Sequence, residues 1–179
     1  MEKYEQGSTG SPPLPQRKDI RIKNYDYSQS GYYFVTICTL DRKNILCEIV
    51  EADDSEKTVG AGLHARPQVR LSQIGFELEK IIKENEITEY VIMPNHIHLV
   101  IKLQTGNLSL SDIVRNIKSF STYKFWQMTG GHRDPPLQNK KEVLWQRNYY
   151  EHIIRNEKEY LEILEYVKNN PLKWELDKY

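Results

Sequence analysis

A pair of histidines, His96 and His98, is the most informative chemical feature of the sequence and lies in the segment VIMPNHIHLVI. The apolar residues around them predict a strand. Because side chains alternate along a strand, both imidazoles would lie on one face. Two neutral imidazoles side by side can bind one metal ion. A pattern this short also fits two half-buried histidines without a metal, or a zinc hydrolase site that would need further His and Asp ligands.

Tyr166 and Asn170 stand four residues apart in the segment LEYVKNNP, where the apolar spacing predicts a helix. Residues i and i+4 lie on the same face of a helix. A phenol can attack a phosphodiester, but its pKa of about 10 makes it a weak nucleophile unless a metal polarises the phosphate. The amide oxygen of Asn170 could complete a metal site beside the two imidazoles. Taken alone, Tyr166 could also be a packed aromatic residue, and Asn170 a residue that ends a helix.

Aromatic and basic residues are interleaved ahead of this helix. Such a mixture is typical of single-stranded nucleic-acid binding, because aromatic rings stack on unpaired bases and basic groups contact phosphates. The DNA-binding candidates are Lys118, Lys124, Trp145, Arg147, Tyr149, His152 and Arg155. Arg147 and Arg155 are favoured for phosphate contact because a guanidinium matches the geometry of a phosphate. Trp145 and Tyr149 could instead be core residues, and the charged residues could form a solvated face.

Hydrophobic periodicity and turn residues predict a series of strands and helices. The expected strands are 32–40, 44–51 as its partner, 89–93, 96–103, and a short one over 143–146. The expected helices are 72–84, 111–128 with Ser109 or Ser111 as its cap, and one from about Asn156 that Pro171 ends. Residues 1–17 indicate a disordered polar tail, and 53–67 a loop insertion. This order predicts an α+β fold in which helices pack on an antiparallel sheet.

The overall composition counts against a purely charge-driven DNA binder. Lys and Arg together number 25, as do Asp and Glu, although a local basic face remains compatible with this balance. Cys38 and Cys47 lack metal-binding spacing and are typical of thiols in a reducing compartment. No apolar run approaches the roughly 18 residues of a membrane span, and the N-terminus lacks an apolar signal core. We therefore expect a soluble, cytoplasmic protein with no membrane partner.

Three segments together resemble a known family. They are YDYSQSGYYFVTICT near the start, VIMPNHIHLVI in the middle, and LWQRNYYEHIIRN followed by EYVKNNPLKW at the end. In this order and spacing they resemble the REP-associated tyrosine transposases, relatives of the single-tyrosine transposases that mobilise small bacterial insertion sequences. The resemblance runs over residues 18–176, which we expect to form a single domain of the HUH type.

The resemblance implies a ferredoxin-like or RRM-like antiparallel sheet flanked by helices. It makes His96 and His98 ligands of Mg²⁺ or Mn²⁺ and Tyr166 the nucleophile. Asn170 would be the third ligand, where the insertion-sequence relatives have Gln. The substrate would be single-stranded DNA that folds into a palindromic hairpin, cut through a 5′-phosphotyrosine intermediate. A monomer is favoured, although a dimer is possible. A catalytically inactive or domesticated module that binds hairpin DNA or RNA is the alternative.

Overall fold

The structure is a computed structural model that describes residues 26, 29–50, 67–104, 106, 108–130 and 143–176. The predicted tail over 1–17 and nearly all of the predicted insertion over 53–67 lie outside these residues. No helix in the described ranges is both long enough and apolar enough to cross a membrane.

The centre of the fold is a four-stranded antiparallel sheet with the strand order β4-β5-β1-β6. Its strands are β1 (Gly31–Cys38), β4 (Glu89–Met93), β5 (His96–Leu103) and β6 (Tyr150–Ile154). A separate two-stranded sheet consists of β2 (Cys47–Val50) and β3 (Gln68–Leu71). The helices are α1 (Gln73–Glu84), α2 (Leu110–Met128) and α3 (Glu157–Asn169), with 3-10 turns η1 (Leu40–Arg42) and η2 (Asn170–Leu176).

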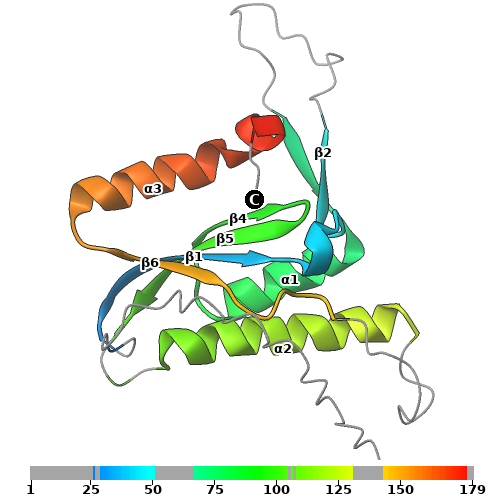
Figure 1. The fold of residues 1–179 in the computed structure, drawn as a ribbon, viewed down its shortest axis with the longest axis horizontal. Helices are drawn as coiled ribbons and strands as arrows, with labels where there is room; N and C mark the ends of the chain where they lie inside the picture. The colour runs from blue at the N-terminus through cyan, green and yellow to red at the C-terminus, as the bar shows by residue number, and fades with distance from the viewer. Residues whose placement is uncertain are drawn as a thin grey trace, which may run out of the picture.

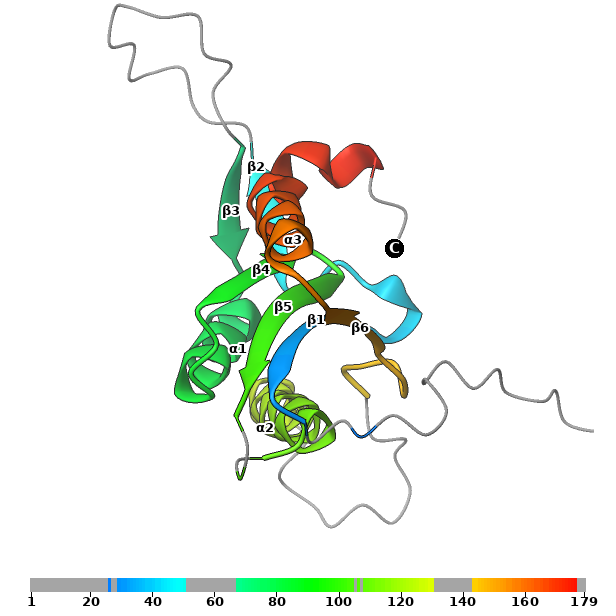
Figure 2. The ribbon, with the colours of Figure 1, turned by 90° about the vertical axis from the view of Figure 1, so that its left-hand side faces the viewer.

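The chain order β1, α1, β4, β5, α2, β6 combined with this strand order is the ferredoxin-like arrangement. The predicted α+β fold, an antiparallel sheet flanked by helices, is therefore confirmed. The β2–β3 sheet is inserted between β1 and α1, and α3 follows the last strand. Figures 1 and 2 show α1 and α2 on one side of the central sheet and α3 on the other.

Strand β1 is covered on both faces, which explains its continuous run of aromatic and β-branched residues. Tyr33, Val35 and Ile37 are 0% exposed and belong to one core cluster with apolar residues of α1 and α2. On the other face, Phe34 packs with Val167 and other apolar residues of α3. Directly paired residues of an antiparallel sheet point to the same side, so the register of β1 with its neighbours decides which side chains face α3.

Each α-helix begins at a side chain that caps its first turn. Ser72 accepts a hydrogen bond from Gly75 N–H, and Asn156 accepts one from Glu159 N–H. Ser109 forms a reciprocal capping box at the start of α2. These starts agree closely with those expected from the sequence. The proline that follows α3 ends the α-helix as predicted, but the chain continues in the tighter turns of η2.

Two strand predictions are wrong. The segment 44–51 is not the partner of β1, because β5 and β6 occupy both edges of β1 and β2 pairs with β3 instead. The strand expected over 143–146 is reduced to a single bridge between Thr39 and Trp145. The second neighbour of β1 is the edge strand β6, whose sequence YEHII has an irregular polar pattern that does not predict a strand.

Candidate active site

The two histidines lie on β5, where the sheet register sets their surroundings. His96 pairs with Cys38 and His98 pairs with Thr36, so both imidazoles point to the side that α3 covers. Both side chains are 0% exposed. Their Nε2 atoms lie 3.1 Å apart and the two rings are edge to face. Strand geometry thus brings two ring nitrogens to one point beneath α3.

The remaining ring nitrogen of each histidine is held by an oxygen atom. His96 Nδ1 lies 2.7 Å from Asn95 Oδ1, and His98 Nδ1 lies 2.8 Å from Thr36 Oγ1. An amide oxygen only accepts, so His96 Nδ1 carries the hydrogen and Nε2 presents a lone pair. When Thr36 Oγ1 accepts from His98 Nδ1–H, both Nε2 lone pairs point to the same place. This is the arrangement that two imidazoles need in order to share a cation.

Burial keeps both imidazoles neutral. It lowers the pKa of His96 to about 4, with a further contribution from the positive charge of Arg42. It lowers the pKa of His98 to about 3, with a further contribution from His96. At neutral pH both rings are therefore in the form that binds metal ions.

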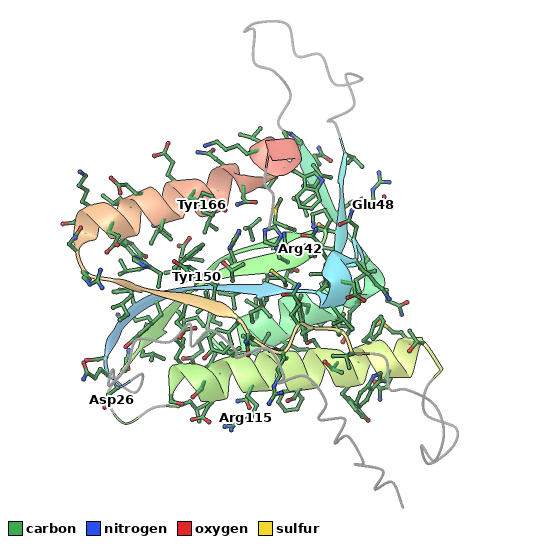
Figure 3. All side chains as sticks on the ribbon, viewed as in Figure 1. Asp26, Arg42, Glu48, Arg115, Tyr150 and Tyr166 are labelled. Atoms are coloured by element: carbon green, nitrogen blue, oxygen red, sulfur yellow. The ribbon has the colours of Figure 1, made fainter. Side chains whose placement is uncertain are left out.

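Helix α3, on which Figure 3 labels Tyr166, brings this residue to His98. The hydroxyl oxygen of Tyr166 lies 3.3 Å from His98 Nε2. Its ring contacts the rings of His98 and Phe34 edge to face, with centroid distances of 5.2 and 5.9 Å. Phe34 in turn stacks on His98 at 5.1 Å. Packing on both sides thus directs the hydroxyl group toward Nε2.

Asn170 follows Tyr166 by one helical turn and is 1% exposed. Its side-chain oxygen is buried and has no hydrogen-bond partner among the residues that the structure describes. A buried polar atom without a partner costs about 1–3 kcal/mol, so a cation or a donor at this oxygen would stabilise the fold. Farther along η2, the ring of Trp174 lies 6.1 Å from that of His96, which brings η2 to the same end of the site.

The spacing of the two imidazoles fits a divalent cation. Two ligands at about 2.1 Å and right angles around an octahedral cation lie about 3.0 Å apart. The Nε2 atoms of His96 and His98 lie 3.1 Å apart. Within the described ranges no three His, Cys, Asp or Glu side chains gather as a metal site. The candidate ligands are therefore the two imidazoles and the unpartnered oxygen of Asn170.

Comparison with known proteins identifies the family. The model of the family described as "Transposase IS200 like" matches residues 27–170. The chain belongs to the IS200-like transposase family. An uncharacterised protein of Haemophilus influenzae is 31% identical in an alignment that covers 92% of this chain and 93% of that protein. The REP-associated tyrosine transposase of Escherichia coli K12 is 33% identical over 88 residues, which cover 49% of this chain and 45% of that protein.

A solved structure of the REP-associated tyrosine transposase bound to a REP hairpin has the same fold. It matches with a TM-score of 0.53 and 22% identity, over 88% of this chain and 76% of that chain. The resemblance to REP-associated tyrosine transposases that the sequence indicates is thus confirmed. The span matched to the IS200-like family includes β1, β5 and α3, the three elements that form the candidate site.

Two aromatic DNA-binding candidates of this IS200-like transposase are packing residues. Trp145 is 2% exposed, and its Nε1–H donates to Ser121 Oγ at 2.8 Å. Tyr149 is partly buried against the same core cluster. A ring as deep as that of Trp145 cannot stack on a base while the fold is intact. The burial of Trp145 therefore argues against the DNA-binding prediction for this residue and favours the alternative that it is a core residue.

Both lysines selected from the sequence hold parts of the fold together. Lys118 Nζ donates to the backbone oxygens of Gln146 and Arg147 at 2.7 and 2.9 Å, and burial lowers its pKa. Lys124 Nζ lies 3.3 Å from a carboxylate oxygen of Glu77, which connects α2 to α1. These contacts give both lysines a structural role without any nucleic acid.

The remaining candidates lie around β6 and the start of α3. His152 Nε2 lies 2.6 Å from Glu159 Oε1, so this ring is fixed to α3. The side chains of Arg147 and Arg155 are exposed and accessible to a phosphate. Tyr150, which the sequence-based selection omits, is 56% exposed, and the register of β6 turns it toward the α3 side. Tyr150 is thus better placed than Tyr149 to contact a base.

Sequence reasoning missed several residues that position the site. Thr36 and Asn95 hold the two histidines, and Phe34 and Trp174 pack against them. Arg42 adds a positive charge near His96. Thr36 belongs to the predicted first strand, but its contact with the site depends on a register between strands that the sequence does not specify.

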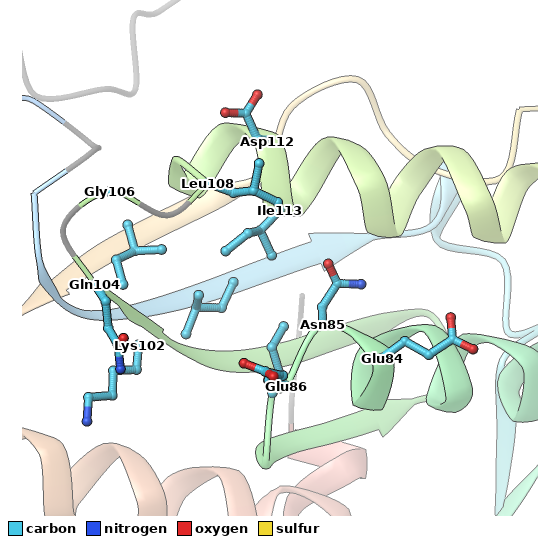
Figure 4. A pocket seen from close by; sticks show the side chains of 12 residues that line it. Glu84, Asn85, Glu86, Lys102, Gln104, Gly106, Leu108, Asp112 and Ile113 are labelled. Carbon is cyan, nitrogen blue, oxygen red and sulfur yellow. The ribbon is translucent and has the colours of Figure 1, made fainter.

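A surface hollow of about 730 Å³ lies at the opposite end of β5 from the first histidine (Figure 4). It is bordered by the C-terminal end of α1 and the N-terminal end of α2. Its lining includes Glu84, Glu86 and Asp112, with Lys102 as a basic group. This predominance of carboxylates disfavours a phosphate backbone. We therefore assign no part of the DNA site to this hollow.

Proposed function

We propose that the protein is a metal-dependent single-stranded DNA endonuclease and strand transferase that acts through Tyr166. The observation that carries the proposal is the 3.3 Å between the Tyr166 hydroxyl and His98 Nε2, and the buried, unpartnered oxygen of Asn170 one helical turn after Tyr166 supports it. A nucleophile, two neutral imidazoles and an oxygen ligand thus come from one chain. A monomer is therefore sufficient for the proposed activity, and no exchange of α3 between subunits is needed.

His96, His98 and Asn170 are the residues that would hold Mg²⁺ or Mn²⁺. When bound, the cation would polarise the scissile phosphate and stabilise the negative charge that develops on it. Imidazole ligands suit Mn²⁺ better than Mg²⁺ because Mn²⁺ is the softer of the two.

Tyr166 would perform the covalent step. Its phenol loses a proton to solvent, and its oxygen bonds to phosphorus while the bond from phosphorus to the 3′ oxygen breaks. The leaving oxygen takes a proton from solvent and becomes a free 3′-OH, and the phosphate remains as a 5′-phosphotyrosine. Attack of a 3′-OH on this ester rejoins a strand by the reverse step and needs no nucleotide cofactor. Packing against Phe34 and His98 would hold the phenol in place for both directions.

We propose a hairpin formed by palindromic single-stranded DNA as the substrate. Support comes from the solved relative, which is bound to a REP hairpin. The exposed side chains of Arg147 and Arg155 are suited to contact its phosphates, and Tyr150 to stack on an unpaired base.

The test uses labelled single-stranded oligonucleotides that carry the palindromes from the DNA bordering this gene. Protein and DNA are incubated with Mn²⁺, Mg²⁺ or EDTA and analysed on a denaturing gel. Wild type should give a covalent adduct that requires metal, and Tyr166→Phe should give none. Tyr123→Phe, which changes an exposed tyrosine on α2, is the matched control and should react like wild type. Absence of an adduct from wild type, or a full yield from Tyr166→Phe, would refute the assignment.

The histidines are tested separately. His96→Ala and His98→Ala should abolish the adduct while most hairpin affinity remains, because the phosphate contacts away from the metal persist. Equal loss of cleavage and binding would make the histidines structural. Hairpin binding by wild type that gives no adduct and is insensitive to chelation would instead identify the protein as a binding module.

A further inference from the structure

The 3-10 turn η1 is hydrogen-bonded to Asn95, in the turn that precedes His96. Thr39 is 0% exposed and donates both its backbone N–H and its hydroxyl to the backbone oxygen of Asn95, at 2.9 and 3.0 Å. On the other side, Leu40 N–H donates to the backbone oxygen of Leu144 at 2.9 Å. Hydrogen bonds on both sides thus set the position of η1 relative to the candidate metal ligands.

The backbone of η1 has an unusual conformation at two successive residues. Asp41 has φ 54° and Arg42 has φ 52°, both in the left-handed region. Asp adopts this region occasionally, whereas a long side chain such as that of Arg rarely does. Strain of this kind persists only where the surroundings impose it, and it clusters at functional sites. This strained conformation sets the direction in which the Arg42 side chain leaves η1, just after β1.

Arg42 is connected to the turn that precedes His96 by two steps of hydrogen bonding. Its backbone N–H donates to the backbone oxygen of Thr39 at 3.2 Å, and Thr39 in turn donates to that of Asn95. Figure 3 shows Arg42 on the side of the sheet where Tyr166 lies, and its side chain is exposed. A guanidinium beside a cation site opposes binding of the cation alone. The same guanidinium favours binding when an anion is bound between the two charges.

We propose that Arg42 binds a non-bridging oxygen of the scissile phosphate and so positions the phosphorus for attack by Tyr166. This inference rests on the proposed function, since it assigns a further residue to the same reaction. The fork of N–H donors on a guanidinium matches phosphate oxygens and stays charged at all relevant pH values. Arg42 would therefore contact the phosphate from η1, whereas Tyr166 would approach it from α3.

The test compares Arg42→Ala with Arg115→Ala, which removes an exposed arginine from α2 on the other side of the sheet. The initial rate of adduct formation is measured with saturating hairpin DNA and Mn²⁺. Arg42→Ala should lower the rate by about 100-fold to 1000-fold, the usual loss when one transition-state donor is removed. Arg115→Ala should remain within about threefold of wild type, as expected for a distant surface change.

A second substrate carries a methylphosphonate at the scissile position, which replaces one charged non-bridging oxygen with a methyl group. The rate penalty of Arg42→Ala should shrink to below about tenfold on this substrate, because the charge that Arg42 would neutralise is gone. Hairpin affinity in EDTA, measured by fluorescence anisotropy in a Tyr166→Phe background, should follow the same pattern. Arg42→Ala should weaken binding of the phosphodiester but not of the methylphosphonate.

The outcomes separate the two proposals. If wild type forms no adduct, the proposed function fails, and the anisotropy comparison still tests Arg42. If wild type reacts and Arg42→Ala reacts at the wild-type rate, or is equally impaired on both substrates, only the role of Arg42 is overturned. Thermal unfolding of each variant reports whether the fold is intact. Should Arg42→Ala fail to fold, Arg42→Gln takes its place in both measurements.

Discussion

Asn170 provides a prediction in which stability and metal binding change in opposite directions. Asn170→Leu keeps the branching and the number of side-chain heavy atoms but removes the oxygen that has no partner among the described residues. In the metal-free protein this change should raise the free energy of unfolding, because an unpaired buried oxygen is replaced by an apolar group of similar shape. The same change should weaken the binding of Mn²⁺, because one ligand atom is lost.

The size of both effects follows from the burial of Asn170. At 1% exposure, nearly the full cost of an unpaired polar atom applies, about 1–3 kcal/mol. Each kcal/mol raises the Tm of a chain of this size by about 2–4 °C. Mn²⁺ at a hundred times its Kd should stabilise wild type by about 2.7 kcal/mol. If losing the ligand weakens binding about tenfold, the same concentration should stabilise the variant by only about 1.4 kcal/mol.

The assay is thermal unfolding followed by circular dichroism, in EDTA and in Mn²⁺. Asn169→Leu, which changes the half-buried neighbouring residue, is the matched control and should leave the stabilisation by Mn²⁺ unchanged. The reasoning is refuted if Asn170→Leu is less stable than wild type in EDTA and still shows the full Mn²⁺ shift. That result would make Asn170 a packing residue without a role in metal binding.

Three further predictions concern the surroundings of the site. Thr36→Val removes the hydroxyl at His98 Nδ1 and should weaken Mn²⁺ binding, measured by calorimetry, by about 10-fold to 100-fold. An unchanged affinity would mean that this contact does not orient the ring. In EDTA, the folded protein keeps His96 and His98 neutral, with pKa values lowered to about 4 and about 3 from 6.5, so below pH 6.5 the unfolded chain binds more protons. The free energy of unfolding, measured in urea, should therefore be at its full value above pH 6.5 and decrease toward pH 4, by up to about 1.4 kcal/mol per pH unit for each ring. The control is a variant with both histidines replaced by Asn. A wild-type profile as flat as that of this control would contradict the burial argument. Trp145→Phe leaves the buried Ser121 hydroxyl without its donor and should lower the free energy of unfolding in urea by about 1–3 kcal/mol. The hairpin affinity of the folded variant should be unchanged. A loss of affinity without a loss of stability would instead make Trp145 a DNA contact.

Local spacing within one element predicted a large part of the site. The period of a strand places His96 and His98 on one face, and the period of a helix aligns Tyr166 with Asn170. Both inferences depend only on neighbours along the chain. That the strand and the helix face one another does not follow from spacing and was expected only from the family resemblance. The ferredoxin-like order of the strands was likewise an expectation from the family.

Residues that reach the site from other elements could not be predicted in this way. Thr36 meets His98 only through the register of β1 with β5, and Arg42 is held near His96 by backbone hydrogen bonds from Thr39. Neither relation leaves a periodic pattern in the sequence. Trp145 shows the opposite error, because an aromatic residue in a basic segment has the same local pattern whether it lies in the core or at the surface. Tertiary packing decides between the two.

Helix α3 and the first residue of η2 carry Tyr166 and Asn170 one turn apart on a single continuous rod. Neither residue can swing away alone without unwinding the turn between them. Under the proposed function, a tilt of this rod would therefore move the Tyr166 hydroxyl and the Asn170 amide oxygen together relative to the imidazoles on β5. The placement of the proposed nucleophile and the completion of the proposed cation site would in this way be mechanically linked.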